Sequence, residues 1–357
     1  MKRHSFILLI LAVTLASCLK TETGGGSAVS FQVAGNSSLT RSYQEYRIGY
    51  GDVPFGAYAW FKGNEIGNDS DFMVNQKVSY NTERMQWLPE GKTYIWPRSG
   101  TLDFICYSPY MDTPPTISED RIVFGPWNPT ENPGSDLMYA DKCYGLSQNP
   151  DAYYYTDVPV RFHHALAKLR FNISLAWAEA DNGSSDKTRW EVDIQSAKLR
   201  NIHESGTLTL MQEGGEWALP DNRVWQSSGS VKDIDLNTAS LTSFTDTQVQ
   251  TLADGMLVMP QEIVDGCVLE MVATIRTYSD RGDGYKLILT ENPVQLSAQL
   301  KNQAITSWRI NQFTTYSVRL APSLPQEGYT GPVTVNFDPA VESWASQTVT
   351  ITVGLGL

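Results

Sequence analysis

Apolar and polar residues alternate with a period of two along much of this 357-residue chain, and that period is typical of half-buried β-strands. Turn-rich segments such as Pro89-Glu90-Gly91 separate the alternating stretches. In the first part of the chain we expect strands at residues 29–33, 53–61, 72–80, 85–88, 102–107, 122–124 and 136–140. Short strands at this spacing predict a β-sandwich.

The alternation changes parity between residues 160 and 173. Apolar residues occupy even positions up to Leu166 and odd positions from Ala165 onward. Such a change indicates a β-bulge, or a long strand whose inward face moves from one sheet to another. We therefore predict that a second domain begins near residue 158.

The second domain has a similar pattern. Strands are expected at residues 190–199, 206–211, 256–259 and 315–320, and a hairpin joins residues 267–278 to 285–289 through a turn at 279–284. Residues 241–252 are predicted to form a short helix.

The last residues of the chain alternate as strongly as the first strand does. The apolar positions are Val333, Val335 and Phe337 in one segment and Val349, Ile351, Val353, Leu355 and Leu357 in the next. If each buried side chain contributes roughly 1.5 to 3 kcal/mol, the last five contribute on the order of 10 kcal/mol before ordering costs. Exposed to water, such a strand is an aggregation hazard. It either closes its own domain or fills a groove in another copy of the protein.

The first residues are typical of an export signal. Lys2 and Arg3 precede an apolar run at residues 6–15, which is too short to span a bilayer but has the size of a signal-peptide core. Leu15-Ala16-Ser17-Cys18 has the form of a bacterial lipobox, in which the thiol of Cys18 takes the lipid. The alternative is a plain signal peptide with an incidental cysteine.

A removable segment is predicted after Cys18. Gly24-Gly25-Gly26-Ser27 has the composition of a flexible tether and precedes the strand of Val29, Phe31 and Val33. Leu39-Thr40-Arg41-Ser42 is polar and loop-like, so Arg41 is a candidate site for trypsin-like cleavage. An ordinary solvated arginine is the alternative interpretation. A cut at Arg41 would separate lipid, tether and strand from the remaining 316 residues.

Composition narrows the class of protein. Ten Trp and 17 Tyr favour β structure. The formal charge is -12, and removal of residues 1–41 would leave -15. So acidic a chain has no electrostatic route to phosphate backbones, which argues against nucleic-acid binding. The charge fits a soluble surface protein.

If Cys18 carries a lipid, three cysteines remain. Cys106, Cys143 and Cys267 are widely spaced and odd in number, so they do not form a disulfide framework. Each lies in an apolar setting, and we assign them to the core as free thiols.

No constellation of residues indicates catalysis. His163 and His164 are adjacent and point to opposite faces of a strand, which suits a metal site poorly. No Gly-x-Ser-x-Gly sequence is present, and no two carboxylates are singled out for glycoside hydrolysis. We therefore expect neither an enzyme nor a cofactor.

Two interaction features stay open. Arg281-Gly282-Asp283 falls at the predicted hairpin tip; this tripeptide is an integrin ligand in some proteins, although turn chemistry alone explains it. Trp and Tyr residues could stack on sugar rings, so a monomeric surface lipoprotein that binds glycans is one candidate function. Tryptophans spread over both domains are more typical of core filling.

Taken together, the chain resembles the fimbrillins, the subunits of Bacteroidales type V pili. The residues that carry the likeness are the lipobox at Cys18, Thr40-Arg41, residues 162–169 (Phe-His-His-Ala-Leu-Ala-Lys-Leu), residues 256–261 (Met-Leu-Val-Met-Pro-Gln), Trp308, and Tyr316-Ser317-Val318. Arg47 is a second candidate cleavage site; Arg41 is preferred because its neighbours are small and polar.

The resemblance implies an all-β protein with two transthyretin-like β-sandwich domains in tandem, after an N-terminal lipoprotein pro-segment. The expected divisions are a signal peptide (1–17), a lipidated pro-segment with a removable strand (18–41), an N-terminal sandwich (42–157), a C-terminal sandwich (158–332) and donor strands (333–357).

The resemblance also implies how the protein assembles. An outer membrane lipoprotein precursor is cut by an arginine-specific protease, and the lost strand opens a groove for the C-terminal strands of a neighbouring pilin subunit. The product is a cell-surface pilus, whose adhesion receptor would lie on a host or bacterial surface.

Overall fold

The computed structural model describes residues 28–34, 53–63, 69–132, 135–147, 157–176, 179–181, 187–213, 216–218, 225–302, 305–322, 335–336 and 345–355. Within these ranges every regular element is a β-strand, as the alternating pattern predicts. No helix in them is long and apolar enough to cross a membrane. The predicted signal peptide, Cys18, Arg41, Arg47 and Leu357 lie outside the described residues.

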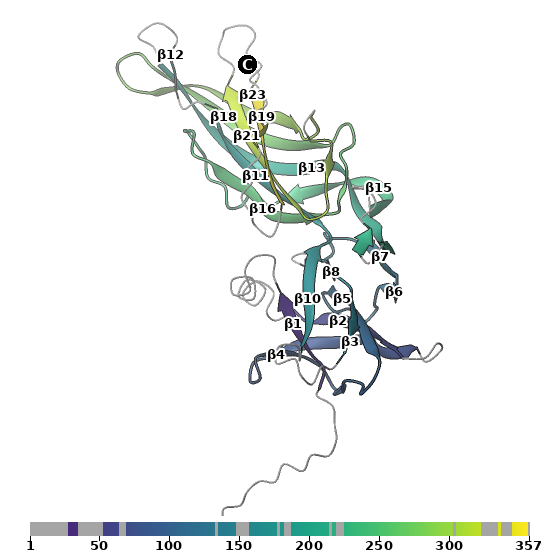
Figure 1. Cartoon of the computed structure of the whole chain (residues 1–357). Helices are drawn as coiled ribbons and strands as arrows, with labels where there is room; N and C mark the ends of the chain where they lie inside the picture. The colour runs from purple at the N-terminus through teal and green to yellow at the C-terminus, as the bar shows by residue number, and fades with distance from the viewer. Residues whose placement is uncertain are drawn as a thin grey trace, which may run out of the picture.

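The first sheet occupies the lower half of the molecule in Figure 1. Its strands are β1 (Ser30–Ala34), β2 (Phe55–Lys62), β3 (Ser70–Asn81), β4 (Gln86–Pro89), β5 (Thr101–Ser108), β8 (Met138–Ala140), β9 (Cys143–Leu146) and β10 (Asp157–His164). Their order is β2-β3-β4-β1-β10-β8-β5-β9, and β2 also pairs with β5. This extra pairing closes the strands into a ring around one apolar core, in which Phe55 and Phe104 are buried.

Two further sheets form the upper half as a sandwich. One contains β16 (Gln250–Val258), β11 (Ala167–Leu175), β21 (Gln312–Pro322), β23 (Ala345–Leu355) and β22 (Val335–Asn336), in that order. The other contains β19 (Lys286–Gln299), β18 (Val268–Asp280), β13 (Lys187–Glu213), β7 (Arg121–Trp127) and β6 (Thr116–Ser118). Apolar side chains from both sheets pack into one core between them.

Several short strands complete this half. β12 (Glu179–Asp181), β14 (Glu216–Ala218) and β15 (Trp225–Leu236) pair with β13, and β17 (Gln261–Glu262) pairs with β20 (Ser307–Trp308).

The two halves are joined by more than the chain between β10 and β11. The β6–β7 hairpin follows β5 in sequence, yet β7 pairs with β13 of the other half. A third apolar core lies at this junction, where Tyr107 and Phe124 stack edge to face beside Leu208. The outer faces of β2 and β5 are therefore buried against the second half.

The parity change corresponds to the passage between the halves. β10 ends at His164 in the first sheet and β11 starts at Ala167 in the second, and Ala165 and Leu166 between them are buried at the junction. By strand pairing, the passage lies at these two residues and not near residue 158, because β10 pairs with β1 and β8 of the first sheet.

One predicted element was wrong, and two predicted strands are parts of a single longer strand. Residues 241–252 do not form a helix: Phe244 is buried, and its backbone exchanges hydrogen bonds of 2.9 and 3.0 Å with Val192. The segments 190–199 and 206–211 are one strand, β13, which pairs with β18 first, then β15 and β7. Asn201, with a φ of 57°, marks an irregularity between the two predicted segments.

Candidate functional site

The backbone of β1 lies inside the first sheet, between β4 and β10 (Figure 1). Five consecutive residues of β1 pair in parallel with β10, from Ser30 opposite Asp157 to Ala34 opposite Arg161. On the other side Phe31 pairs with Trp87 of β4. Just before the strand, the amide of Val29 donates a 2.8 Å hydrogen bond to the carbonyl of Tyr94. Removal of β1 would therefore leave backbone groups unpaired on both neighbours.

The side chains of β1, together with that of Val29 just before it, alternate between two environments. Val29, Phe31 and Val33 are at most 2% exposed and enter the core of the first sheet. The ring of Phe31 meets those of Phe55 and Phe104 edge to face, with centroids 5.5 and 5.8 Å away. These three apolar residues occupy a slot whose walls come from strands far away in the sequence.

On the opposite face, Ser30 is also buried, and its hydroxyl donates a hydrogen bond to a carboxylate oxygen of Asp157. Gln32 is exposed, so the two polar positions of β1 differ. This contact was not predicted from the sequence. Its only local signal was a serine at the first polar position of the alternating segment.

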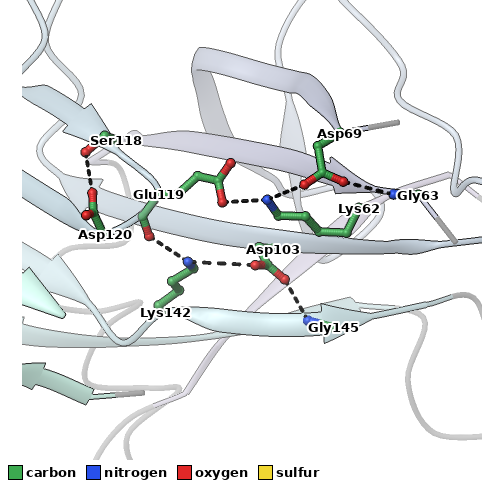
Figure 2. A network of polar contacts seen from close by, with 9 residues as sticks. All are labelled: Lys62, Gly63, Asp69, Asp103, Ser118, Glu119, Asp120, Lys142 and Gly145. Carbon is green, nitrogen blue, oxygen red and sulfur yellow. Dashed lines mark hydrogen bonds and ion pairs between the residues drawn. The ribbon is translucent and has the colours of Figure 1, made fainter. Parts of the chain in front are cut away.

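The walls of the slot are held together without β1. Figure 2 shows Lys142, whose side chain is 7% exposed, between the carbonyl oxygen of Glu119 at 2.6 Å and Asp103 of β5 at 3.7 Å. Asp103 in turn accepts a 2.8 Å hydrogen bond from the amide of Gly145 in β9. These contacts bind β5 and β9 to the turn between β6 and β7.

Lys62, at the end of β2, belongs to the same network. Its ammonium group lies 3.0 Å from Asp69 and 2.6 Å from Glu119, and the hydrogen bond to Glu119 is the main cause of its raised pKa (Figure 2). β2 is therefore also tied to the β6–β7 turn, and the rear of the first sheet does not depend on β1 for its position.

The second candidate strand, β23, lies next to the edge of its sheet. It pairs in parallel with β21 over eleven residues, from Gln312 opposite Ala345 to Pro322 opposite Leu355. Among the described residues, the strand beyond it is the two-residue β22, which pairs with Val349 and Thr348. Val349, Ile351, Val353 and Leu355 of the predicted donor set fall within β23. In this structure the strand thus completes the sheet of its own chain.

The predicted hairpin tip is well formed and exposed. A carboxylate oxygen of Asp280 accepts hydrogen bonds of 2.7 and 2.9 Å from the amides of Gly282 and Gly284, and these bonds lower its pKa. Both glycines have a positive φ, 98° and 95°, which favours glycine. Asp283 forms an ion pair with Lys286.

His163 and His164 do not share a site. His164 is buried 2.5 Å from Asp136, whereas His163 lies 2.8 Å from Asp141 and stacks on Tyr139. Among the residues that the structure describes, no group of three or more metal-ligating side chains converges.

The three cysteines among the described residues are free thiols. Cys106 and Cys267 are buried and Cys143 is half-buried, with its sulfur 2.8 Å from the carbonyl oxygen of Pro159. Burial raises the pKa of Cys143 and of Cys267 to about 12, and that of Cys106 is also raised well above its ordinary value.

Aromatic residues likewise fill cores more than they line a surface. Trp87, Trp96, Trp190 and Trp308 are at most 4% exposed.

These features define a class: an all-β sandwich protein, with one short strand inserted inside its first sheet and a long strand next to the edge of its second. The family model for fimbrillin-like proteins matches residues 40–344, so the chain belongs to the fimbrillin-like family.

The structure is also similar to solved structures from Bacteroides. A candidate cell adhesion protein from Bacteroides uniformis is 16% identical with a TM-score of 0.45, over 81% of this chain and 91% of that one. A candidate cell adhesion protein from Bacteroides ovatus is 13% identical with a TM-score of 0.40, over 80% and 96%. A fimbrial protein from Bacteroides ovatus is 10% identical with a TM-score of 0.32, over 82% and 48%. No curated protein matches the sequence.

Membership of this family supports a pilin-type role in adhesion, at a fimbrium on the cell surface and in contact with other pilin subunits. It points to a structural protein and not to an enzyme.

Proposed function

We propose that this chain is a structural subunit of a type V pilus that matures by proteolysis and polymerises by strand exchange. In this proposal Cys18 carries a lipid that holds the precursor at the outer membrane, and an arginine-specific protease cuts after Arg41, or alternatively after Arg47. β1 then leaves, and β23 of a neighbouring subunit takes its place. Each half of the molecule is a transthyretin-like domain.

The observation that carries the proposal is the position of β1. It lies inside a sheet, yet both candidate cleavage sites fall between it and β2 in the sequence. After a cut at either arginine, β1 would be held by hydrogen bonds and side-chain packing alone. A strand held in that way can be replaced by another strand of the same alternation.

Apolar contacts decide which strand is preferred. β1 buries Val29, Phe31 and Val33, about 6 kcal/mol at roughly 2 kcal/mol for each side chain. The donor segment offers Val349, Ile351, Val353, Leu355 and Leu357, on the order of 10 kcal/mol by the same rule. Backbone hydrogen bonds contribute similarly in both cases, because both strands pair along their length. Leu355 and Leu357, which extend beyond the length of β1, provide the additional apolar burial in the neighbour and offset the pairing with β21 that β23 gives up.

The decisive experiment compares the full chain with a variant truncated before Val349. After limited trypsin treatment, the full chain is expected to start at Ser42 and to form ladders that resist heating on a denaturing gel. The truncated variant is expected to undergo the same cleavage and to stay monomeric. Normal polymerisation of the truncated variant would contradict strand donation, and a monomer that binds polysaccharide would favour the glycan-binding alternative.

A further inference from the structure

We infer that the donor strand enters the groove in the direction of β1, with Thr350 in the place of Ser30 and its hydroxyl on Asp157. This inference rests on the proposed strand exchange and adds to it a direction, a register and a residue that determines specificity. It follows from three independent comparisons between β1 and β23.

The first comparison is between the two sequences. Residues 29–34 read Val-Ser-Phe-Gln-Val-Ala, and residues 349–354 read Val-Thr-Ile-Thr-Val-Gly. Apolar residues coincide at the first, third and fifth positions, a hydroxyl at the second and a small residue at the sixth.

Other registers fit the slot less well. A shift by one residue places threonines in the buried positions, since side chains alternate between faces. A shift by two in one direction buries Gln347 in the place of Val29, and a shift by two in the other places Val353, smaller than Ile351, in the space of Phe31. The register with Ile351 in the place of Phe31 therefore fills the slot best.

The second comparison is between the neighbouring strands. In β10, Val158 and Val160 are the parallel partners of Phe31 and Val33. In β21, Val318 and Leu320 are the parallel partners of Ile351 and Val353. All four partners are at most 1% exposed. β23 therefore pairs in parallel with the buried strand β21, just as β1 pairs in parallel with the buried strand β10. If β23 enters the groove in the direction of β1, it also pairs in parallel with β10 of its neighbour.

The third observation is the hydrogen bond of Ser30. This serine is 5% exposed and donates to Asp157, so departure of β1 removes a donor from a carboxylate at the start of β10. An incoming strand with an apolar residue at this place would leave the half-buried carboxylate without that donor, which is costly. Thr350 supplies the same hydroxyl. The pair of Asp157 and Thr350 therefore selects this register over strands that lack a hydroxyl there.

Cysteine pairs test the register. Gln32 and Pro159 are exposed Cα partners, so the residue that replaces Gln32 can be linked to position 159 from the solvent side. In the processed full chain, P159C combined with T352C is expected to give subunit-to-subunit disulfides. P159C combined with T350C reports a reversed strand or a shift by two in one direction, and P159C combined with G354C reports a shift by two in the other; both are expected to give none.

The outcomes separate the two proposals. Linkage through T350C or G354C, or no linkage through T352C in polymers that form normally, would overturn the register and leave strand exchange standing. Absence of any polymer that depends on β23 would overturn both. The parent chain, with its three free cysteines, gives the background.

A second measurement addresses Asp157. Thr350→Val is expected to slow polymerisation roughly tenfold, the change that one lost hydrogen bond to a charged group produces. Thr350→Ser should preserve the rate. Thr352→Val is the matched control, because its place in the groove is the exposed one of Gln32. Equal slowing in Thr350→Val and Thr352→Val would contradict a specific role for Thr350, and the melting temperature of each precursor shows whether it is folded.

Discussion

Phe31 has its aromatic neighbours on strands that stay in the molecule when β1 leaves. We expect Phe31→Ala to lower the free energy of unfolding of the precursor by about 3 to 4 kcal/mol, the usual cost of a buried Phe to Ala change. The processed polymer should be unaffected, because it has lost residue 31. Phe55→Ala is the control, since Phe55 lines the slot in both forms and its loss should destabilise both. Urea denaturation measures the two precursors. Resistance of the ladders to heat measures the polymers, and weakening of the Phe31→Ala ladder would argue against removal of β1.

Lys142 is the charged group most deeply placed in the network behind the slot. Lys142→Met should lower the free energy of unfolding by about 3 kcal/mol, since it leaves Asp103 buried without its cation. Lys301→Met is a matched control: its ion pair with Asp265 is exposed, and urea denaturation is expected to show no measurable change. A loss no larger than that of the control would mean that the network does not stabilise the fold.

The free thiols give a prediction about pH. Because burial raises the folded-state pKa of Cys143 and Cys267 to about 12, the unfolded chain ionises first as the pH rises from 9.0. The stability that comes from protonated thiols is thus intact below pH 9 and is lost as the pH rises towards 12. At pH 8 we expect slow reaction with a thiol reagent in the folded protein and fast reaction in urea. Equal rates in both states would contradict burial of the sulfur atoms.

At the scale of single residues, the sequence predicted burial correctly where apolar and polar positions alternate. The burial of Val29, Phe31 and Val33 follows from alternation alone. Asp103, Lys142 and Glu119 were missed, because an isolated charge in a strand or a turn has the same local pattern whether it faces water or a polar partner far away in the sequence.

Among the elements, the β18–β19 turn is explained by its own chemistry. Asp280 caps two amides, two glycines adopt a positive φ, and Asp283 pairs with Lys286. Gly282 and Asp283 of the tripeptide 281–283 therefore each have a place in the turn, and we expect Asp283→Glu to leave cell attachment unchanged. A clear fall in attachment would instead assign a receptor to this tip. Lys286→Glu controls for a change in surface charge.

The strands show where local pattern stops being sufficient. The hairpin of β18 and β19 was predictable, because its strands are adjacent and its turn residues are distinctive. The helix expected at residues 241–252 failed because Phe244 pairs with Val192, some fifty residues earlier. Local periodicity carries no information about a partner so far away in the sequence.

At the scale of the whole molecule, the all-β class followed from the alternating pattern and the spacing of the strands. Two long-range features did not. The pairing of β7 with β13 joins residues about eighty positions apart, and the ring closure through β2 and β5 depends on a further distant pairing. Both are set by tertiary packing at the junction, where the outer faces of β2 and β5 meet Leu208 and Leu210.

The pairing of β7, which follows β5 of the first half, with β13 of the second half has a mechanical consequence. A hinge needs a single flexible connection, whereas here a hairpin, an apolar core and the passage at Ala165 and Leu166 all cross the waist of the molecule. Each protomer should therefore act as a stiff rod, and any bending of a fibre built from such rods would be concentrated at the joints from one protomer to the next.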